Sequence, residues 1–189
     1  MSTKNIMIVG VGGQGTLLAS RILGNAVIQK GYDVKVSEVH GMSQRGGSVV
    51  TYVKFGDAVH SPIIDKGEAD IILAFECLEA YRALPWLKKG GKMIVNDQKI
   101  NPMPVITGAV DYPADILAKL EAVVDLTAVD ALSLAREAGN AKAVNVVLIG
   151  VMAKNTEIPY AEWIETIKNT VPAKFLAANL KAFDLGYNL

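Results

Sequence analysis

The chain has 189 residues, which suits one domain with a substantial hydrophobic core. Hydrophobic residues make up 51% of it and charged residues 20%, a balance that excludes a disordered chain. The 19 basic and 19 acidic residues cancel, which argues against broad nucleic-acid binding and against a polybasic membrane surface. A mean hydropathy of +0.29 fits either a well-filled α/β core or an apolar surface covered by a partner subunit. We therefore expect a single domain over residues 1–189.

In chain order, apolar periodicity and glycine or proline breaks predict alternating strands and helices. The expected strands are 6–9, 33–39, 48–55, 69–75, 92–95 and 123–126. The expected helices are 15–30, 76–89 (interrupted by Pro85 and ended by Gly90 and Gly91), 113–121, 130–138, 141–153 and 160–185, with a proline-rich connection at 101–104. Helix 141–153 is apolar nearly all round, which places it in the core or in a subunit interface.

Strands 33–39 and 48–55 follow each other without a crossover helix, which predicts an antiparallel pair. The other strands alternate with helices, as parallel strands do. The expected fold is therefore a three-layer α/β/α, Rossmann-like domain. Its sheet is mixed and mostly parallel, and the last third of the chain is helical.

The first glycine-rich segment lies between the first strand and the first helix. Its candidate residues for cofactor binding are Gly10, Gly12, Gly13, Gln14 and Gly15. Unpaired backbone N–H groups at such a helix start, at the positive end of the helix dipole, can hold a phosphate. The alternative is that these glycines only permit tight packing of strand and helix.

The second glycine-rich segment follows the strand 33–39. Its candidate residues for cofactor binding are Ser43, Gln44, Arg45, Gly46 and Gly47. A guanidinium can clamp a phosphate or a carboxylate, and the neighbouring hydroxyl and amide groups can add hydrogen bonds. The alternative is an ordinary exposed hairpin loop.

Other polar residues receive no site assignment. His40 could shuttle protons, but a hydrogen-bonded structural role at the end of a strand is the preferred interpretation. His60 has no matching ligand nearby, so no metal site is assigned. Cys77, the single cysteine, excludes an intrachain disulfide, a four-cysteine iron–sulfur cluster and a cysteine-rich zinc site. The adjacent acids Glu76 and Glu79 should raise the pKa of its thiol, which argues against a nucleophile, and no catalytic residue is assigned. Asn140, Lys142 and Asn145 fall at one helix start and could face a cleft, although capping alone explains Asn140.

The segments 12–15 and 37–47, together with 138–145, resemble the gamma component of the 2-oxoacid:ferredoxin oxidoreductases, and most closely the indolepyruvate type. The resemblance covers nearly the whole chain. It implies a complex that decarboxylates a 2-oxoacid on thiamine diphosphate, reduces ferredoxin through iron–sulfur clusters and forms an acyl-coenzyme A.

The resemblance also implies a division of labour between subunits. The chain has too few cysteines for a cluster, and its Gly56-Asp57 pair lacks the downstream thiamine motif. A large partner subunit is therefore expected to carry thiamine diphosphate and [4Fe-4S] clusters, while this chain completes the complex without catalysing alone and contributes to binding coenzyme A.

Two other functions remain open from the sequence. One is a stand-alone NAD(P)-dependent oxidoreductase, with Gly10, Gly12 and Gly15 at the pyrophosphate and Glu38 at the ribose. The other is a scaffold that binds no small molecule. The chain starts with a strand pattern instead of a signal peptide, and its longest apolar run, 146–153, is too short to span a bilayer, so we expect a cytoplasmic protein.

Overall fold

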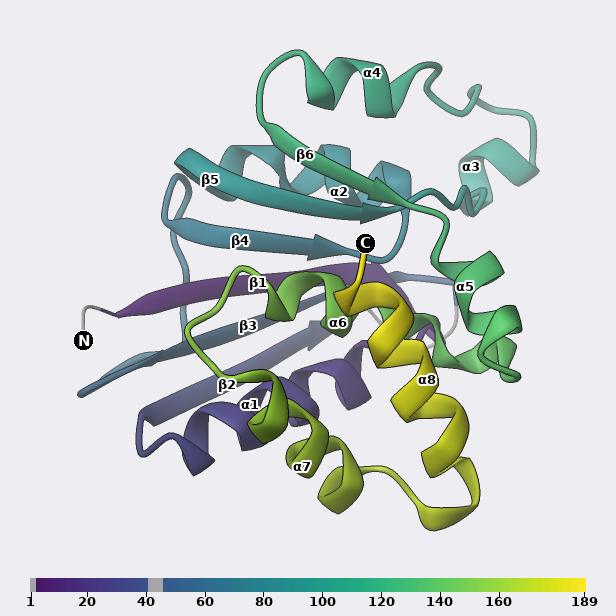
Figure 1. The fold of residues 1–189 in the computed structure, drawn as a ribbon. Helices are drawn as coiled ribbons and strands as arrows, with labels where there is room; N and C mark the ends of the chain where they lie inside the picture. The colour runs from purple at the N-terminus through teal and green to yellow at the C-terminus, as the bar shows by residue number, and fades with distance from the viewer. Residues whose placement is uncertain (1–2, 41–45) are drawn as a thin grey trace.

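A six-stranded sheet forms the centre of the computed structural model, which describes residues 3–40 and 46–189 (Figure 1). The strand order is β2-β3-β1-β4-β5-β6. The strands are β1 (Lys4–Val11), β2 (Asp33–His40), β3 (Ser48–Gly56), β4 (Ala69–Ala74), β5 (Leu87–Asn96) and β6 (Asp125–Val129).

The sheet is mixed. Strand β3 pairs antiparallel with both β1 and β2. The pairs β1–β4, β4–β5 and β5–β6 are parallel. The pairing of Val36 with Val53 fixes the register of β2 on β3. The short connection between β2 and β3 leaves no room for a crossover helix, which is why this pair is antiparallel. The predicted mixed, mostly parallel sheet is confirmed.

Helices cover both faces of the sheet (Figure 1). The α-helices are α1 (Thr16–Gln29), α2 (Cys77–Ala83), α3 (Met103–Ile106), α4 (Ile116–Glu121), α5 (Ala131–Glu137), α6 (Val144–Ala153), α7 (Tyr160–Thr170) and α8 (Leu176–Tyr187). Short 3-10 helices occupy Leu84–Trp86, Ala141–Ala143 and Ala173–Phe175. Helices α2 and α4 pack on one face, and α1, α5, α6, α7 and α8 on the other. This gives the predicted three layers. Among the described residues, no helix is long and apolar enough to cross a membrane.

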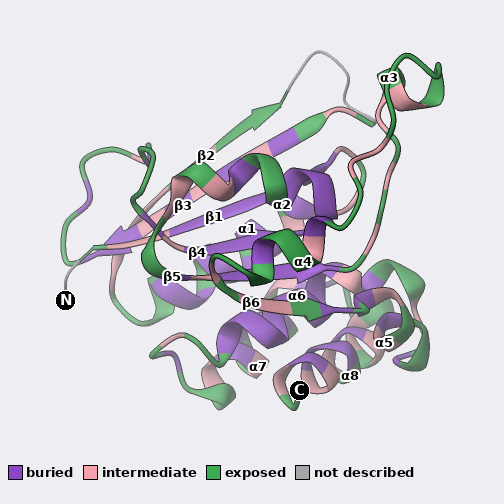
Figure 2. Ribbon diagram, turned by 90° about the horizontal axis from the view of Figure 1, so that it is seen from above, coloured by how far each residue is buried: buried purple, intermediate pink, exposed green. Residues whose placement is uncertain are grey.

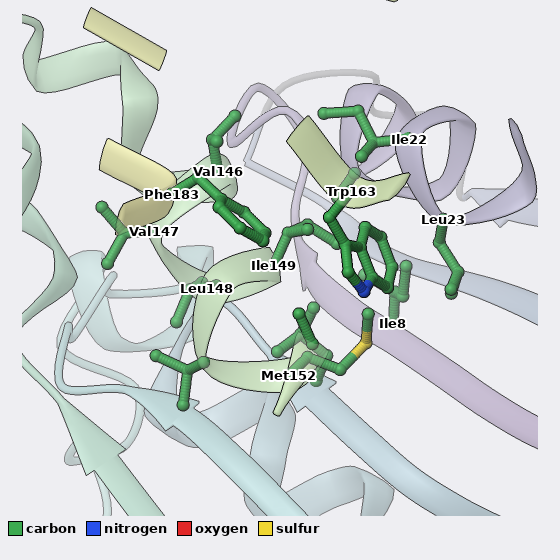
Figure 3. Close-up of a cluster of buried hydrophobic side chains, with 14 of the residues drawn as sticks. Ile8, Ile22, Leu23, Val146, Val147, Leu148, Ile149, Met152, Trp163 and Phe183 are labelled. Carbon is green, nitrogen blue, oxygen red and sulfur yellow. The ribbon is translucent and has the colours of Figure 1, made fainter. Parts of the chain in front are cut away.

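Helix α6 lies at the centre of the larger hydrophobic core, where Figure 3 shows its side chains packed between the sheet and the outer helices. Every residue from Asn145 to Ala153 is buried. Trp163 of α7 and Phe183 of α8 close over α6, and both have 0% of their surface exposed. The all-round apolar pattern therefore reflects a core helix.

Several predicted elements differ from the structure. The proline-rich connection expected at 101–104 contains the start of α3, and the strand expected at 123–126 is β6, which begins at Asp125 and ends at Val129. Helix α2 ends at Ala83, and the residues expected to complete it form a 3-10 turn at Pro85 and then the start of β5. Gly90 and Gly91 lie inside β5, where a Cβ on Gly91 would approach the carbonyl oxygens of β4 to 3.0 Å. The expected helix 160–185 is two helices, because Val171 is extended before Pro172.

Candidate functional site

The two glycine-rich segments meet at the carboxyl end of β1. The N–H of Gly12 donates to the carbonyl oxygen of Gly47 at 2.8 Å, and the N–H of Gly46 donates to that of Gly12 at 3.3 Å. These bonds continue the β1–β3 ladder beyond the pair formed by Val11 and Ser48. The fold thus brings together two segments that the sequence analysis singled out separately.

The glycines of the first segment serve different purposes. A Cβ on Gly10 would lie 3.0 Å from the Cβ of Phe75, and one on Gly15 would lie 2.8 Å from the amide nitrogen of Asn145. Packing therefore accounts for these two. Gly13 has a φ of 103° and open space where a side chain would stand. Its left-handed backbone explains the glycine, and its surroundings leave room for another molecule.

A hollow of about 440 Å³ opens beside this turn, at the start of α1. It is lined by Gly12, Gly13, Gly15, Thr16, Leu17, Glu38, His40 and Val49. The helix start favours an anion there, since its N–H groups and dipole point outward. The carboxylate of Glu38, which accepts a hydrogen bond from the Thr51 hydroxyl at 3.3 Å, favours a hydroxyl-bearing group instead. The hollow thus suits a molecule that carries both phosphate and sugar hydroxyls.

Three of the predicted site residues, Ser43, Gln44 and Arg45, lie outside the described residues. Their proposed contacts with an anion stay predictions. The described ends of the same segment, His40 and Gly46, flank them at the edge of the site.

Gln14 is held within the chain. Its Oε1 accepts from the N–H of Val11 at 2.7 Å, and its Nε2 donates to the carbonyl oxygen of Phe75 at 2.9 Å and to Oε1 of Gln98 at 3.2 Å. Oε1 thus holds the end of β1, while Nε2 links the glycine turn to the ends of β4 and β5. Ligand binding by Gln14 stays a prediction, whereas these hydrogen bonds give the side chain a structural role.

Polar residues that no sequence motif pointed to complete this cross-link. Asn96 is buried, and its Nδ2 donates to Phe75 O at 3.1 Å and to Gln98 Oε1 at 3.0 Å, while its Oδ1 accepts from the N–H of Ala131. The available signal was a polar run directly after a buried strand. The carboxyl ends of parallel strands gather at one edge of a sheet, where ligands bind in open α/β folds.

Asn140 and Asn145 fill structural positions. The side chain of Asn140 accepts from the N–H of Lys142 at 3.0 Å, the expected N-cap. Asn145 is buried, and its Nδ2 donates to the carbonyl oxygen of Gly15 at 3.3 Å. The predicted cleft-facing role of Asn145 is therefore replaced by support of the glycine turn.

Cys77 is fully buried in α2. Burial raises the pKa of its thiol to about 11, with further contributions from Asp97 and Glu76. Glu79, the second acid expected to act on this thiol, accepts instead from Ser48 and from Arg82. A thiol that stays protonated at neutral pH is a poor nucleophile. No group of three or more potential metal ligands occurs among the residues that the structure describes.

The chain belongs to the pyruvate ferredoxin/flavodoxin oxidoreductase family, whose sequence model matches residues 5–189. Proteins named indolepyruvate oxidoreductase subunit IorB are among its relatives. The one from Pyrococcus horikoshii is 46% identical over 98% of this chain and 95% of its own length, and the one from Thermococcus kodakarensis is 44% identical with the same coverage.

Solved structures share the fold. The gamma subunit of a keto/oxoacid ferredoxin oxidoreductase from Geobacter sulfurreducens superposes with a TM-score of 0.73 at 24% identity, covering 98% of this chain and 96% of its own. A 2-oxoglutarate:ferredoxin oxidoreductase from Magnetococcus marinus, solved with 2-oxoglutarate, coenzyme A and succinyl-CoA bound, gives 0.74 at 18% identity. The match covers 100% of this chain but 31% of that longer one.

Proposed function

We propose that this chain is the small, gamma-type subunit of an indolepyruvate or related aryl pyruvate:ferredoxin oxidoreductase. The chain is a subunit of a 2-oxoacid:ferredoxin oxidoreductase complex, and the indolepyruvate class is supported by the relatives at 38–46% identity. Such a complex converts the 2-oxoacid and coenzyme A into an acyl-coenzyme A and carbon dioxide, and transfers two electrons to ferredoxin. The cytoplasm is the compartment that we propose for it.

The thiamine diphosphate and the [4Fe-4S] clusters belong, in this proposal, to a large partner subunit. This chain has one cysteine, and that cysteine is buried with a raised pKa, so its residues do not fit a cluster. Purified free of its partner, the chain should oxidise no 2-oxoacid when thiamine diphosphate and coenzyme A are supplied. Turnover with an artificial electron acceptor would contradict this.

The contribution of this chain is at the coenzyme A side of the reaction. The observation that carries this proposal is the contact between the two glycine segments, through Gly12, Gly46 and Gly47. It creates one surface with a helix start, open backbone at Gly13 and a neighbouring carboxylate at Glu38. Coenzyme A carries a diphosphate and a ribose phosphate, groups that suit such a surface.

Arg45 provides the test. With the partner subunit present, Arg45→Ala should raise the coenzyme A concentration for half-maximal turnover at least about tenfold, because a charge-assisted hydrogen bond is lost. Arg45→Lys should raise that coenzyme A concentration less than Arg45→Ala does, since lysine keeps the charge but lacks the planar guanidinium. Arg21→Ala, on the exposed side of α1, is the matched control. An unchanged coenzyme A dependence in Arg45→Ala would refute binding by this segment.

One observation supports the alternative function of a stand-alone NAD(P)-dependent enzyme: Glu38 lines the hollow beside the glycine turn. However, β3 separates β2 from β1, so Glu38 does not stand on the strand next to the turn. Calorimetric titration of the chain with NAD, NADP and coenzyme A separates the two functions. Tight binding of NAD or NADP, lost in Glu38→Ala, would favour the alternative.

A further inference from the structure

The connection between β5 and α4 is unusually long. It runs from residue 97 to residue 115, whereas strand-to-helix connections in α/β units usually take roughly 2–6 residues. It contains the short helix α3, which stands clear of the sheet and of the other helices in Figure 2. Long loops inside compact domains usually have a function.

One buried carboxylate fastens both ends of this connection. Oε1 of Glu76 accepts from the N–H of Ile100 at 3.1 Å and from the hydroxyl of Tyr112 at 2.5 Å. Glu76 has 1% of its surface exposed and also caps α2. Burial and the bond to Glu76 raise the pKa of Tyr112, so its hydroxyl stays a donor. We call residues 100–112 the arm; its base is fixed to the body of the protein.

The arm exposes apolar side chains. The exposed fractions are 65% for Met103, 64% for Ile106 and 56% for Val110. Residues 100–110 contain no charged side chain. Single exposed apolar residues are common, but Met103 and Ile106 lie one helical turn apart on α3 and line one groove, and a shared apolar surface of this kind marks an interaction site.

A groove of about 380 Å³ lies between the arm, α2 and the start of β3. Its apolar lining is Val11, Leu78, Ile100, Pro102, Met103 and Ile106. Gly46 and Gly47 also line this groove, so it borders the second glycine-rich segment. The groove lies on the α2 face of the sheet, whereas the hollow beside Gly13 lies on the α1 face. A molecule seated on the arm would therefore reach Gly46 and Gly47.

We propose that the arm docks onto the large partner subunit, which covers Met103, Ile106 and Val110 and inserts an apolar side chain into the groove. This inference rests on the proposed function. It places the partner beside Gly46 and Gly47 of the second glycine-rich segment. The match to the Magnetococcus marinus protein covers 31% of that chain, so there this fold is part of a longer chain of different sequence. This supports a partner of different sequence over a second copy of this chain.

The test is a titration of the labelled chain with the purified partner subunit. Met103→Asn combined with Ile106→Asn should weaken the complex at least about tenfold, because exposed apolar anchors dominate such interfaces. Val123→Asn is the matched control, since Val123 is also 65% exposed but lies on the turn between α4 and β6. It should bind as the wild type does. Thermal melting of both variants checks that they are folded.

A second variant addresses the base of the arm. Tyr112→Phe removes the hydroxyl that donates to Glu76 and leaves Met103 and Ile106 unchanged. Hydrogen exchange in residues 100–112 should become faster, and binding should weaken by about threefold or more, since a loosened arm must be ordered at docking. Unchanged exchange and unchanged affinity would contradict the anchoring role.

The outcomes separate this inference from the proposed function. A wild-type chain that fails to bind the partner subunit would refute the proposed function. A complex that forms with the wild type and equally well with the double arm variant would overturn the docking inference alone. Sedimentation of the chain by itself tests whether the arm binds a second copy of this chain. If the chain self-associates and the double arm variant does not, while both still bind the partner subunit, the arm contacts a second copy and the inference is overturned.

Discussion

Two regions of the molecule are held together in opposite ways. At the carboxyl edge of the sheet, Gln14, Asn96 and Gln98 join the glycine turn to the strand ends through side-chain hydrogen bonds. Between α6 and α8, contact depends on the absence of side chains. A Cβ on Gly150 would collide with the carbonyl oxygen of Phe183, and one on Gly186 with that of Val147.

The two regions differ in how completely side chains fill them. Gly150 and Gly186 let α6 and α8 approach so closely that no water fits between the two helices. At the carboxyl edge nothing lies within 4 Å of a Cβ built on Gly13, so apolar packing does not fill this part of the edge. Its buried polar groups are tolerable because they are paired, as unpaired ones would cost about 1–3 kcal/mol each. The edge is thus cross-linked by hydrogen bonds while it leaves space at Gly13.

The largest expected effect is at the packed region. Gly186→Val should lower stability by about 3 kcal/mol or more, because the new side chain must push α8 away from the backbone of α6. Urea unfolding followed by circular dichroism measures this. Gly24→Ala is the control, since the nearest atom to its Cβ, in Val36, lies 4.0 Å away. It should be neutral or gain up to about 1 kcal/mol from helix propensity. Equal effects at Gly186 and Gly24 would mean that the contact between α6 and α8 does not depend on a glycine at position 186.

The polar edge should be less costly to disturb. Gln14→Ala breaks the bonds to Val11, Phe75 and Gln98, so we expect a loss of about 1–3 kcal/mol in the free energy of unfolding. A double-mutant cycle with Gln98→Ala should reveal coupling of about 0.5 kcal/mol or more. Strictly additive losses would mean that the two side chains act independently. Full stability of Gln14→Ala with a changed coenzyme A dependence would instead assign Gln14 to the ligand.

The sequence predicted more of the fold than of the site. Local patterns located the glycine turn, the antiparallel pair and the core helix, because periodicity and loop length depend on neighbouring residues. The bond between Gly12 and Gly47 and the cross-link from Gln14 to Gln98 join residues that are distant in the sequence. No local pattern encodes such pairs. The misplaced end of α2 has the same origin, because contacts with β4 place Gly91 in a strand.

The smallest effect concerns Cys77, the single cysteine, whose Sγ lies 3.7 Å from the carbonyl oxygen of Asn96 at the polar edge. Its pKa is about 11 in the folded chain against an ordinary value of 9.0, because burial disfavours the thiolate. The folded state therefore binds the proton more tightly than the unfolded state. This stabilisation is complete below pH 9 and is lost as the pH rises from 9 to 11.

Urea unfolding at pH 7 and at pH 10 can isolate this contribution. The wild type should lose about 1 kcal/mol more than Cys77→Ala over that interval, since only the wild type carries the thiol. Tyr112, whose pKa is also raised, titrates in both proteins and cancels in the difference. The comparison uses the change with pH, so the cavity left by the alanine cancels as well. An equal loss in both proteins would mean that the thiol is solvated, and that the polar edge is more open at α2 than its burial indicates.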